Sequence, residues 1–268
     1  MNIKKLHNDN QAAWDEAAEQ YEADEVGAIE FLRNGGRNFE APEFAYLDQL
    51  SQWCGRAVHL QCAGGKDTLS LWNQGAREVV GIDISPRMIG TARRRAEALG
   101  APATWYCCDL LDTPAELNAT ADLVYTGRVA LCWIMDIDGW ACVVARLLKP
   151  GGRLYLYEGH PLDWIWDASA TDLRLDPEYG NYFDRRVIDD QGWTPEYIGD
   201  LGKPREAHAV KHERQWLIGD ILNALTGAGL RFGRLEEHPD TFWEVLPNLP
   251  DTVLTKLPHT YSLLMFKP

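Results

Sequence analysis

The stretch "AVHLQCAGGKDTLSLW" (residues 57–72) decides the fold of this chain. Its apolar start, Ala57–Gln61, is typical of a strand, and the polar turn that follows contains Gly64-Gly65. Residues 68–73 have the pattern of a short helix. A strand, a glycine-containing turn and a helix in this order are typical of a nucleotide-type cofactor loop, because backbone N–H groups at the start of the helix are free to bind a ligand.

Strands and helices are predicted to alternate through the next hundred residues. Ser85 is a good helix N-cap, Pro86 suits the first helical position, and Gly100 is a typical helix stop. Strands that alternate with helices indicate a parallel sheet covered on both faces. The pattern predicts a helix at 85–100, another that begins near residue 138, and strands at 78–83, 103–110, 121–127 and 153–159.

Both ends of the chain depart from this alternation. Residues 9–32 and 43–52 are predicted to be helical, and a helix at 216–230 precedes two strands near 231–238 and 261–267. Residues 161–210 contain many aromatic, Asp, Pro and Gly residues, so we expect an inserted cap rather than a second domain. The 268 residues are then one domain with a substantial core.

The composition limits the classes of partner. Hydrophobic residues make up 46% of the chain and charged residues 25%, as in ordinary globular proteins. No apolar run approaches the ~20 residues needed to span a bilayer, and the N-terminus lacks an apolar signal core, so a cytoplasmic protein without membrane attachment is expected. The net charge of −14 disfavours nucleic acid as a partner.

The cysteines and histidines do not indicate a metal site. The six cysteines form no CxxC pair, so reduced thiols are the simpler interpretation. His208 and His212 are four residues apart and would share one face of a helix as metal ligands, but no cysteine or carboxylate pattern accompanies them. No metal is therefore predicted.

Three ligands compete for the loop. A nucleoside triphosphate needs GxxxxGK[ST], but Leu60 stands at the first glycine and Asp67 at the Ser or Thr. A dinucleotide needs GxGxxG, and only the adjacent pair Gly64-Gly65 is present. S-adenosylmethionine has no phosphate, so it tolerates a loop with few glycines.

Two acids at successive strand ends favour this third ligand. Asp83 ends the second predicted strand, 18 residues after Gly65, at the distance where a carboxylate meets ribose hydroxyls. Asp109 ends the third strand, where it can accept from an adenine amino group. Both acids are expected at the carboxyl edge of the sheet, although each could instead be a turn or capping residue.

The order of five motifs resembles the class I S-adenosylmethionine-dependent methyltransferases, especially the bacterial small-molecule branch with a His-Leu-Gln-Cys cofactor loop. The motifs are "AVHLQCAGGKD", "VVGIDISPRMI", "YCCDLLD", "ADLVYTGRVALCWI" and "LLKPGGRLYLYEGHP". The resemblance covers residues 10–160 well. It implies a Rossmann-like, doubly wound, seven-stranded α/β sheet that is mostly parallel, with an antiparallel C-terminal strand and the inserted cap, and an N-terminal helical lid over residues 1–52.

The resemblance also implies the cofactor contacts. His59 matches the acidic position of the family loop, and Gln61, Ala63 and Gly65 match its three glycines. Because a neutral His59 loses a charge contact to the cofactor amino group, backbone carbonyls are expected to replace it. The implied cofactor-binding residues are Trp14, Tyr21, His59, Gln61, Cys62, Ala63, Gly65, Asp83, Ile84, Met88, Cys108, Asp109, Leu110, Thr126 and Gly127.

The reacting centre is expected after the fifth strand. His160 is the candidate general base or substrate contact, with a structural turn histidine as the alternative, and Glu158 is a weaker candidate. The aromatic residues of the insert could enclose an acceptor or form the core of the cap. Trp14 and Tyr21 could form a wall around the sulfonium or fix their helix to the sheet. The candidate substrate residues are Arg128, which could instead pair with a surface carboxylate, Trp133, His160, Trp166 and Tyr182.

The sequence therefore favours methyl transfer from S-adenosylmethionine to a small molecule, at oxygen, nitrogen or a carboxylate. A nicotinamide-dependent oxidoreductase and a non-catalytic module that binds S-adenosylmethionine are the alternatives.

Overall fold

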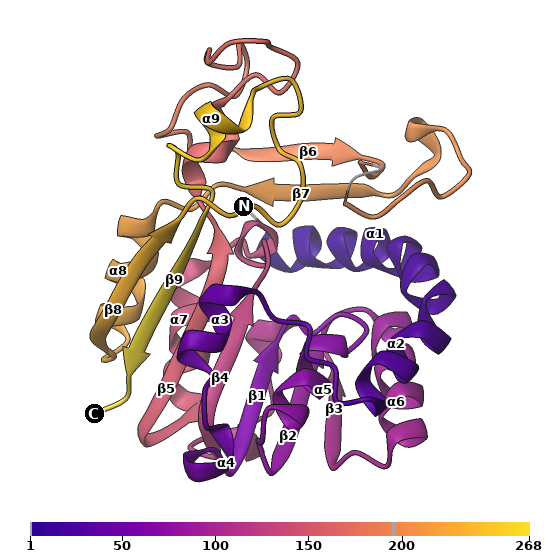
Figure 1. Ribbon diagram of the computed structural model, residues 1–268, viewed down its shortest axis with the longest axis vertical. Helices are drawn as coiled ribbons and strands as arrows, with labels where there is room; N and C mark the ends of the chain where they lie inside the picture. The colour runs from indigo at the N-terminus through magenta and orange to yellow at the C-terminus, as the bar shows by residue number, and fades with distance from the viewer. Residues whose placement is uncertain (1, 195–196) are drawn as a thin grey trace.

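A seven-stranded sheet organises the molecule (Figure 1). The computed structural model describes residues 2–194 and 197–268. Strands β1 to β5 are parallel, and the C-terminal strand β9 is antiparallel to both of its neighbours. This confirms the predicted fold class. The sheet order is β3(Ala103–Cys107)-β2(Glu78–Asp83)-β1(Arg56–Leu60)-β4(Ala121–Gly127)-β5(Leu148–Gly159)-β9(Thr260–Phe266)-β8(Arg231–His238).

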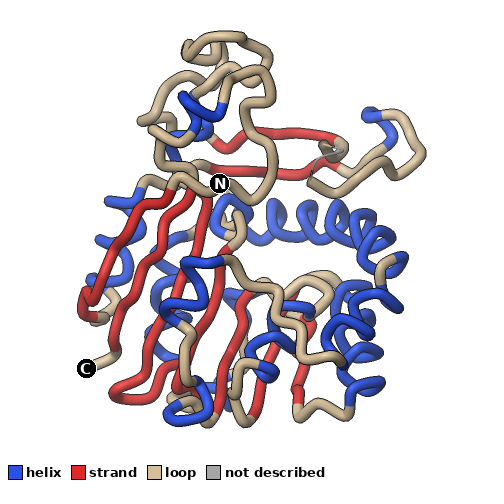
Figure 2. The backbone as a smooth tube through the Cα atoms, viewed as in Figure 1, coloured by secondary structure: helices blue, strands red, loops and turns tan. Residues whose placement is uncertain are grey.

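Helices cover both faces of the sheet, as Figure 2 shows. One face packs against α7 and α8 through Val124, Leu154 and Trp140, and the other packs against α3 to α5 through Leu123, Leu50 and Leu71. The helices are α1(Ile3–Ala23), α2(Glu25–Arg33), α3(Ala41–Tyr46), α4(Leu50–Trp53), α5(Lys66–Asn73), α6(Pro86–Leu99), α7(Ile137–Leu147), α8(Ile218–Gly227) and α9(Asp251–Leu254). Apolar residues on both faces of the central strands are what a parallel sheet requires.

Local sequence signals set the boundaries of α6. The Ser85 hydroxyl accepts a hydrogen bond from the Met88 N–H at 3.1 Å, and Pro86 is the first helical residue. Gly100 ends the helix in a left-handed conformation with φ of 64°. The helix predicted at 85–100 is therefore confirmed. It brings the residues after β2 back to the sheet edge where β3 begins.

A roof lies over the carboxyl ends of the parallel strands (Figure 1). Helix α1 crosses this edge, and the hairpin β6(Val187–Gln191)–β7(Val210–Arg214) lies above it. The hairpin extends four residues beyond the end at residue 210 predicted for the inserted cap. Residues 239–259, which include α9, add a second part of the roof that the sequence did not indicate.

Side-chain hydrogen bonds connect helix α1 to the hairpin β6–β7 and the loop before β7. The Asn10 carboxamide accepts from the His212 N–H at 2.6 Å and donates to the His212 carbonyl at 2.9 Å. His208 lies 3.0 Å from a Glu16 carboxylate oxygen. His212 lies in strand β7 and His208 just before it, so the two do not share a helix face. His208 contacts Glu16, and His212 contacts Asp9 and Asp189.

The described residues form neither a metal-binding cluster nor a membrane-spanning helix. No group of three or more His, Cys, Asp or Glu side chains in residues 2–194 and 197–268 is placed to hold a metal ion. None of the described helices has the length and apolar character needed to cross a membrane.

Candidate active site

The loop after β1 keeps left-handed backbone at positions where the sequence has no glycine. Gln61 has φ of 58° and Ala63 has φ of 43°, and Gly65 follows with φ of 76°. Two hydrogen bonds fix this loop: the Ala63 N–H donates to Asp83 Oδ2 at 2.8 Å, and Gln61 Nε2 donates to the Ala130 carbonyl at 2.7 Å. The loop thus keeps the left-handed backbone typical of glycine, although Gln61 and Ala63 occupy two of the positions where the family loop has glycine.

Asp83 lies at the end of β2 and borders a cavity. Its Oδ1 accepts from the Ser85 N–H at 2.9 Å, so both carboxylate oxygens have a backbone partner. Burial raises the pKa of Asp83 to about 6, although these N–H groups act in the opposite direction. The side chain remains partly accessible from the cavity, and each oxygen still has a second lone pair for a ligand hydroxyl.

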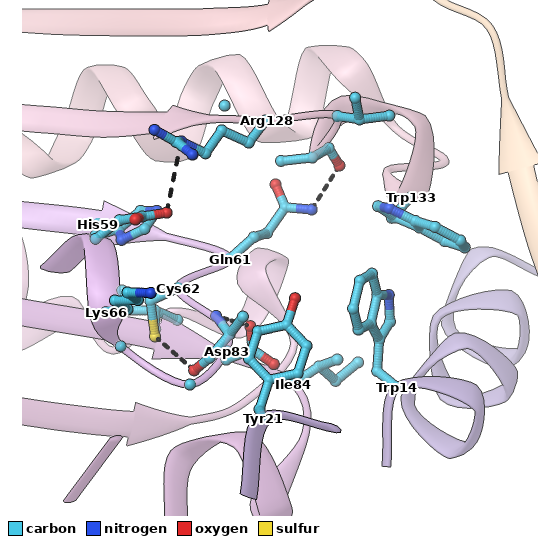
Figure 3. A pocket seen from close by; sticks show the side chains of 18 of the residues that line it. Trp14, Tyr21, His59, Gln61, Cys62, Lys66, Asp83, Ile84, Arg128 and Trp133 are labelled. Carbon is cyan, nitrogen blue, oxygen red and sulfur yellow. Dashed lines mark hydrogen bonds and ion pairs between the residues drawn. The ribbon is translucent and has the colours of Figure 1, made fainter. Parts of the chain in front are cut away.

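The cavity beside Asp83, called here the cofactor cavity, has a volume of about 400 Å³. This is within the usual range for small-molecule sites. Figure 3 shows Tyr21 and Trp14 reaching toward Asp83 and Gln61 from α1. Of the predicted cofactor-binding residues, those that line this cavity are Trp14, Tyr21, His59, Gln61, Cys62, Ala63, Gly65, Asp83, Ile84, Cys108, Asp109, Leu110 and Gly127.

Asp109 is held by the N-terminal helix. His7 Nδ1 lies 2.8 Å from Asp109 Oδ2, and the Leu111 N–H donates to Oδ1 at 2.9 Å. Burial favours the protonated carboxyl, but the hydrogen bonds from His7 and Leu111 and the nearby positive charges together outweigh burial and lower the pKa of Asp109. His7 and Asn10 also line the cavity, but no sequence pattern identified them, because their partners are more than 100 residues away.

His59 is neutral in this environment. Burial lowers its pKa to about 4, and its Nδ1 is 2.8 Å from the Thr68 hydroxyl. Arg128 lies near it in Figure 3, but its guanidinium donates to the fully buried Glu43 at 2.8 Å and to the Asn38 carbonyl at 2.6 Å. The expected surface pairing of Arg128 is therefore wrong in one respect, since the main partner carboxylate is buried.

A second cavity, called here the acceptor cavity, adjoins the first and has a volume of about 340 Å³. It lies under the roof, and its lining includes residues of β5, β7, β9 and the segment 239–259. Five residues line both cavities and form the wall between them: Val129, Trp133, Tyr197, Phe242 and Trp243. The acceptor cavity therefore opens beside the loop after β4.

Aromatic rings dominate this wall. Trp14 and Trp133 meet edge to face with centroids 5.3 Å apart, and Trp193 lies 4.8 Å from Trp14. Tyr197 and Trp243 are 4.9 Å apart. Trp193 and Tyr197 belong to the insert, and Trp243 belongs to the segment 239–259. Some of the aromatic residues of the insert therefore line a cavity. The sequence left open whether the aromatic residues of the insert enclose an acceptor or form the core of the cap, and it did not identify which rings line a cavity.

Glu158 lines the acceptor cavity from the end of β5. Its Oε2 accepts from the N–H groups of Ala130 and Leu131 at 2.9 and 3.0 Å, and its Oε1 accepts from Gly159 at 2.9 Å. Burial raises the pKa of Glu158 to about 7 against the effect of these donors. Glu158 thus has a protonation equilibrium near neutral pH, which the strand pattern alone did not suggest.

His160 also lines the acceptor cavity, but both of its ring nitrogens have partners. Nδ1 accepts from the Leu162 N–H at 3.1 Å, so Nε2 carries the proton and donates to Glu237 at 2.9 Å. Burial lowers the pKa of His160. These contacts are those of a histidine that caps a turn, and they leave no free nitrogen to accept a substrate proton.

Four predicted site residues lie outside both cavities. Met88 and Thr126 are fully buried, and Met88 packs against Ala17 and Ala18 of α1. Trp166 forms an isolated bridge with Leu175, and Tyr182 stacks edge to face on Phe183 within the cap. The aromatic richness of the insert could not distinguish these packing residues from Trp164, which does line the acceptor cavity.

Comparison with known proteins assigns the central segment. Residues 57–152 match the family described as "Methyltransferase domain". The demethylmenaquinone methyltransferase of Tropheryma whipplei is 37% identical over 103 residues, which are 38% of this chain and 41% of that protein. A curated protein encoded in transposon TN4556 of Streptomyces fradiae, "Uncharacterized 37.1 kDa protein", is 31% identical over 60% of this chain and 51% of its own length.

The chain spans about half the length of the curated relatives it matches. Its fold extends further than these sequence matches. A solved S-adenosylmethionine-dependent methyltransferase from Mesorhizobium loti superposes with a TM-score of 0.57 at 23% identity, over 84% of this chain and 96% of that one.

Proposed function

We propose, from the premise that this chain carries a class I S-adenosylmethionine-dependent methyltransferase domain, that it methylates a small molecule held in the acceptor cavity. The observation that carries the proposal is the pair of adjoining cavities at the carboxyl edge of the sheet. One is bordered by Asp83, which ends β2, and by Asp109, which lies two residues after β3, and the other is covered by aromatic rings.

The residues of the first cavity fit the cofactor. Asp83 can accept from ribose hydroxyls, Ile84 can pack on the adenine, and Asp109 keeps acceptor capacity for an adenine amino group. Tyr21 and Trp14 close the cavity from α1. S-adenosylmethionine supplies a methyl group activated by a sulfonium. The aromatic faces of Trp14 and Trp133 favour such a cation by about 0.5–2 kcal/mol.

The acceptor is positioned and, where necessary, deprotonated by the second cavity. Enclosure by Trp133, Tyr197 and Trp243 excludes water and orients the nucleophile, an effect that can supply roughly 7–11 kcal/mol. Glu158 is the candidate proton acceptor, because its pKa of about 7 suits proton transfer at neutral pH. The proposed acceptor atom is therefore an oxygen or nitrogen that loses a proton, or a carboxylate oxygen that needs no base.

Calorimetric titration with S-adenosylhomocysteine tests the cofactor assignment. The wild-type chain should bind it, and Asp83→Ala should weaken binding by about 1.5–3 kcal/mol because a charge-assisted hydrogen bond is lost. Binding of NAD without binding of S-adenosylhomocysteine would support an oxidoreductase instead. An unchanged dissociation constant in Asp83→Ala would contradict the assigned ribose contact.

Transfer itself requires a separate measurement. Radiolabelled S-adenosylmethionine incubated with a broad set of small molecules should label at least one acceptor. Tight cofactor binding with no transfer to any compound would favour a non-catalytic module.

A further inference from the structure

The carboxamide of Gln61 is fixed at one end and unpartnered at the other. Nε2 donates to the Ala130 carbonyl at 2.7 Å, which sets the orientation of the amide group. Oε1 is buried and has no hydrogen-bond partner among the residues described, 2–194 and 197–268. Buried acceptors in folded proteins are nearly always paired, so this oxygen indicates a donor supplied by a ligand of the cofactor cavity.

The position of Gln61 indicates which part of the ligand it meets. Gln61 lies between Asp83 on one side of the loop and Ala130, in the loop after β4, on the other (Figure 3). If Asp83 holds the ribose, the loop beyond it faces the amino-acid part of S-adenosylmethionine. The amino group of that part is a cation with three N–H donors.

Three other side chains that line the cavity, Asp83, Asp109 and His59, already have protein partners. Asp83 and Asp109 each accept two hydrogen bonds from the protein. His59, which stands at the family's acidic position, is neutral and bonded to Thr68. Among these groups, only Gln61 Oε1 is both oriented by the protein and unpaired.

We propose that Gln61 Oε1 accepts a hydrogen bond from the amino group of the bound cofactor. The side chain then takes the place of the charge contact that a neutral His59 cannot make. This replaces the expectation that backbone carbonyls alone hold the amino group. The proposal rests on the proposed function, because it requires S-adenosylmethionine in the cofactor cavity.

A double-mutant cycle between protein and ligand tests it. S-adenosylhomocysteine is compared with its desamino analogue, in which hydrogen replaces the amino group, on wild type and Gln61→Met. Removing either partner should weaken binding by about 10- to 100-fold, the range for a hydrogen bond to a charged group. Removing both should cost little more than removing one.

Gln74→Met is the matched control. The Gln74 amide also donates to a backbone carbonyl, that of Leu47 at 3.0 Å, but Gln74 is outside the cofactor cavity, so its replacement should leave both affinities unchanged. If Gln61→Met does not fold, Gln61→Glu keeps an acceptor at the site and should still prefer the ligand with the amino group.

The outcomes separate this proposal from the proposed function. Failure of the wild type to bind S-adenosylhomocysteine would overturn the function itself. Normal wild-type binding with equal losses for both ligands in Gln61→Met would show that Gln61 acts through the loop, and this proposal would be wrong. An unchanged affinity in that variant would also overturn it.

Discussion

Backbone strain at single residues is concentrated around the cofactor cavity. Gln61, Ala63, Arg128 and Val129 all have φ between 43° and 63°, a conformation that costs a residue with a side chain about 1–2 kcal/mol. All four line the cofactor cavity from the loops after β1 and β4. Strain of this kind persists where surrounding contacts enforce it, and it is often found at functional sites.

Gly65 shows which loop position cannot accept any side chain. A Cβ on Gly65 would lie 2.7 Å from both Ala92 Cβ and the Trp105 ring, and its φ is 76°. Gly65→Ala should therefore lower the free energy of unfolding by about 2–5 kcal/mol, as the sum of overpacking and left-handed backbone costs. Urea unfolding measures the change.

Gly100→Ala is the control for the backbone contribution. Gly100 has a similar φ of 64°, and no heavy atom lies within 4 Å of its added Cβ. Its replacement should cost only about 1–2 kcal/mol. Equal losses in the two variants would mean that the contacts of Gly65 with Ala92 and Trp105 have no steric importance.

The residue types of the cofactor loop were readable in the sequence, but their pairing was not. Spacing identified Asp83, and the structure places it beside the cavity with Ala63. Glu158 was underrated because a position at a strand end does not reveal how deeply the side chain is buried. Its raised pKa depends on that burial, which outweighs the opposite effect of the N–H groups of Ala130, Leu131 and Gly159.

At the scale of elements, the carboxyl end of β5 carries two candidate general bases, Glu158 and His160, which substitutions can distinguish. Glu158→Gln should leave S-adenosylhomocysteine affinity within about twofold, because Glu158 is outside the cofactor cavity, but should reduce methyl transfer at least 10²-fold if the acceptor must lose a proton. The Gln side chain cannot receive that proton. Single-turnover transfer of radiolabel, with the acceptor found in the screen, measures the rate.

His160→Gln is the companion variant. Because the His160 nitrogens cap the turn at Leu162 and pair with Glu237, this change should reduce stability more than the rate of the folded enzyme. If His160→Gln abolishes transfer and Glu158→Gln does not, the base is His160, as the sequence first indicated.

Elements with strong local signals were predictable, whereas the roof was only partly so. The structure begins and ends β2 and β4 at the predicted residues, 78–83 and 121–127, because buried apolar runs specify strands. Residues 239–259 were not recognised as part of the roof. This segment contains little regular structure. Its position above the sheet depends on tertiary contacts such as that between Tyr157 and Phe242, whose ring centroids are 5.0 Å apart.

At the scale of the molecule, enclosure of the site depends on contacts between distant parts of the chain. His7 meets Asp109, and Asn10 meets His212, about 200 residues away. No local sequence pattern encodes such pairs. The sequence therefore predicted an N-terminal helical lid but not the hydrogen bonds that hold it against the rest of the chain. The two cavities exist only after α1, the hairpin and the segment 239–259 have assembled over the sheet edge.

The dependence of stability on pH is a property of the whole folded chain, and three titratable groups of the site contribute to it with different signs. Asp83 and Glu158 have pKa values of about 6 and about 7, above their ordinary values of 3.8 and 4.5. The folded protein holds their protons longer, so their contribution is present at low pH and is lost as pH rises through the folded values. The contribution of His59 to stability has the opposite dependence on pH, because its pKa is lowered in the folded chain.

His59 has a folded pKa of about 4 against an ordinary value of 6.5. Between these values the unfolded chain binds a proton that the folded chain does not, so stability falls as pH decreases through this window. Comparing wild type with His59→Gln isolates this contribution from the acids. The free energy of unfolding of wild type relative to the variant should fall by up to about 3 kcal/mol between roughly pH 7 and pH 4, as measured by urea unfolding at several pH values. Above about pH 7 the difference should be constant. A difference that does not change across the whole range would mean that His59 is not buried as a neutral imidazole.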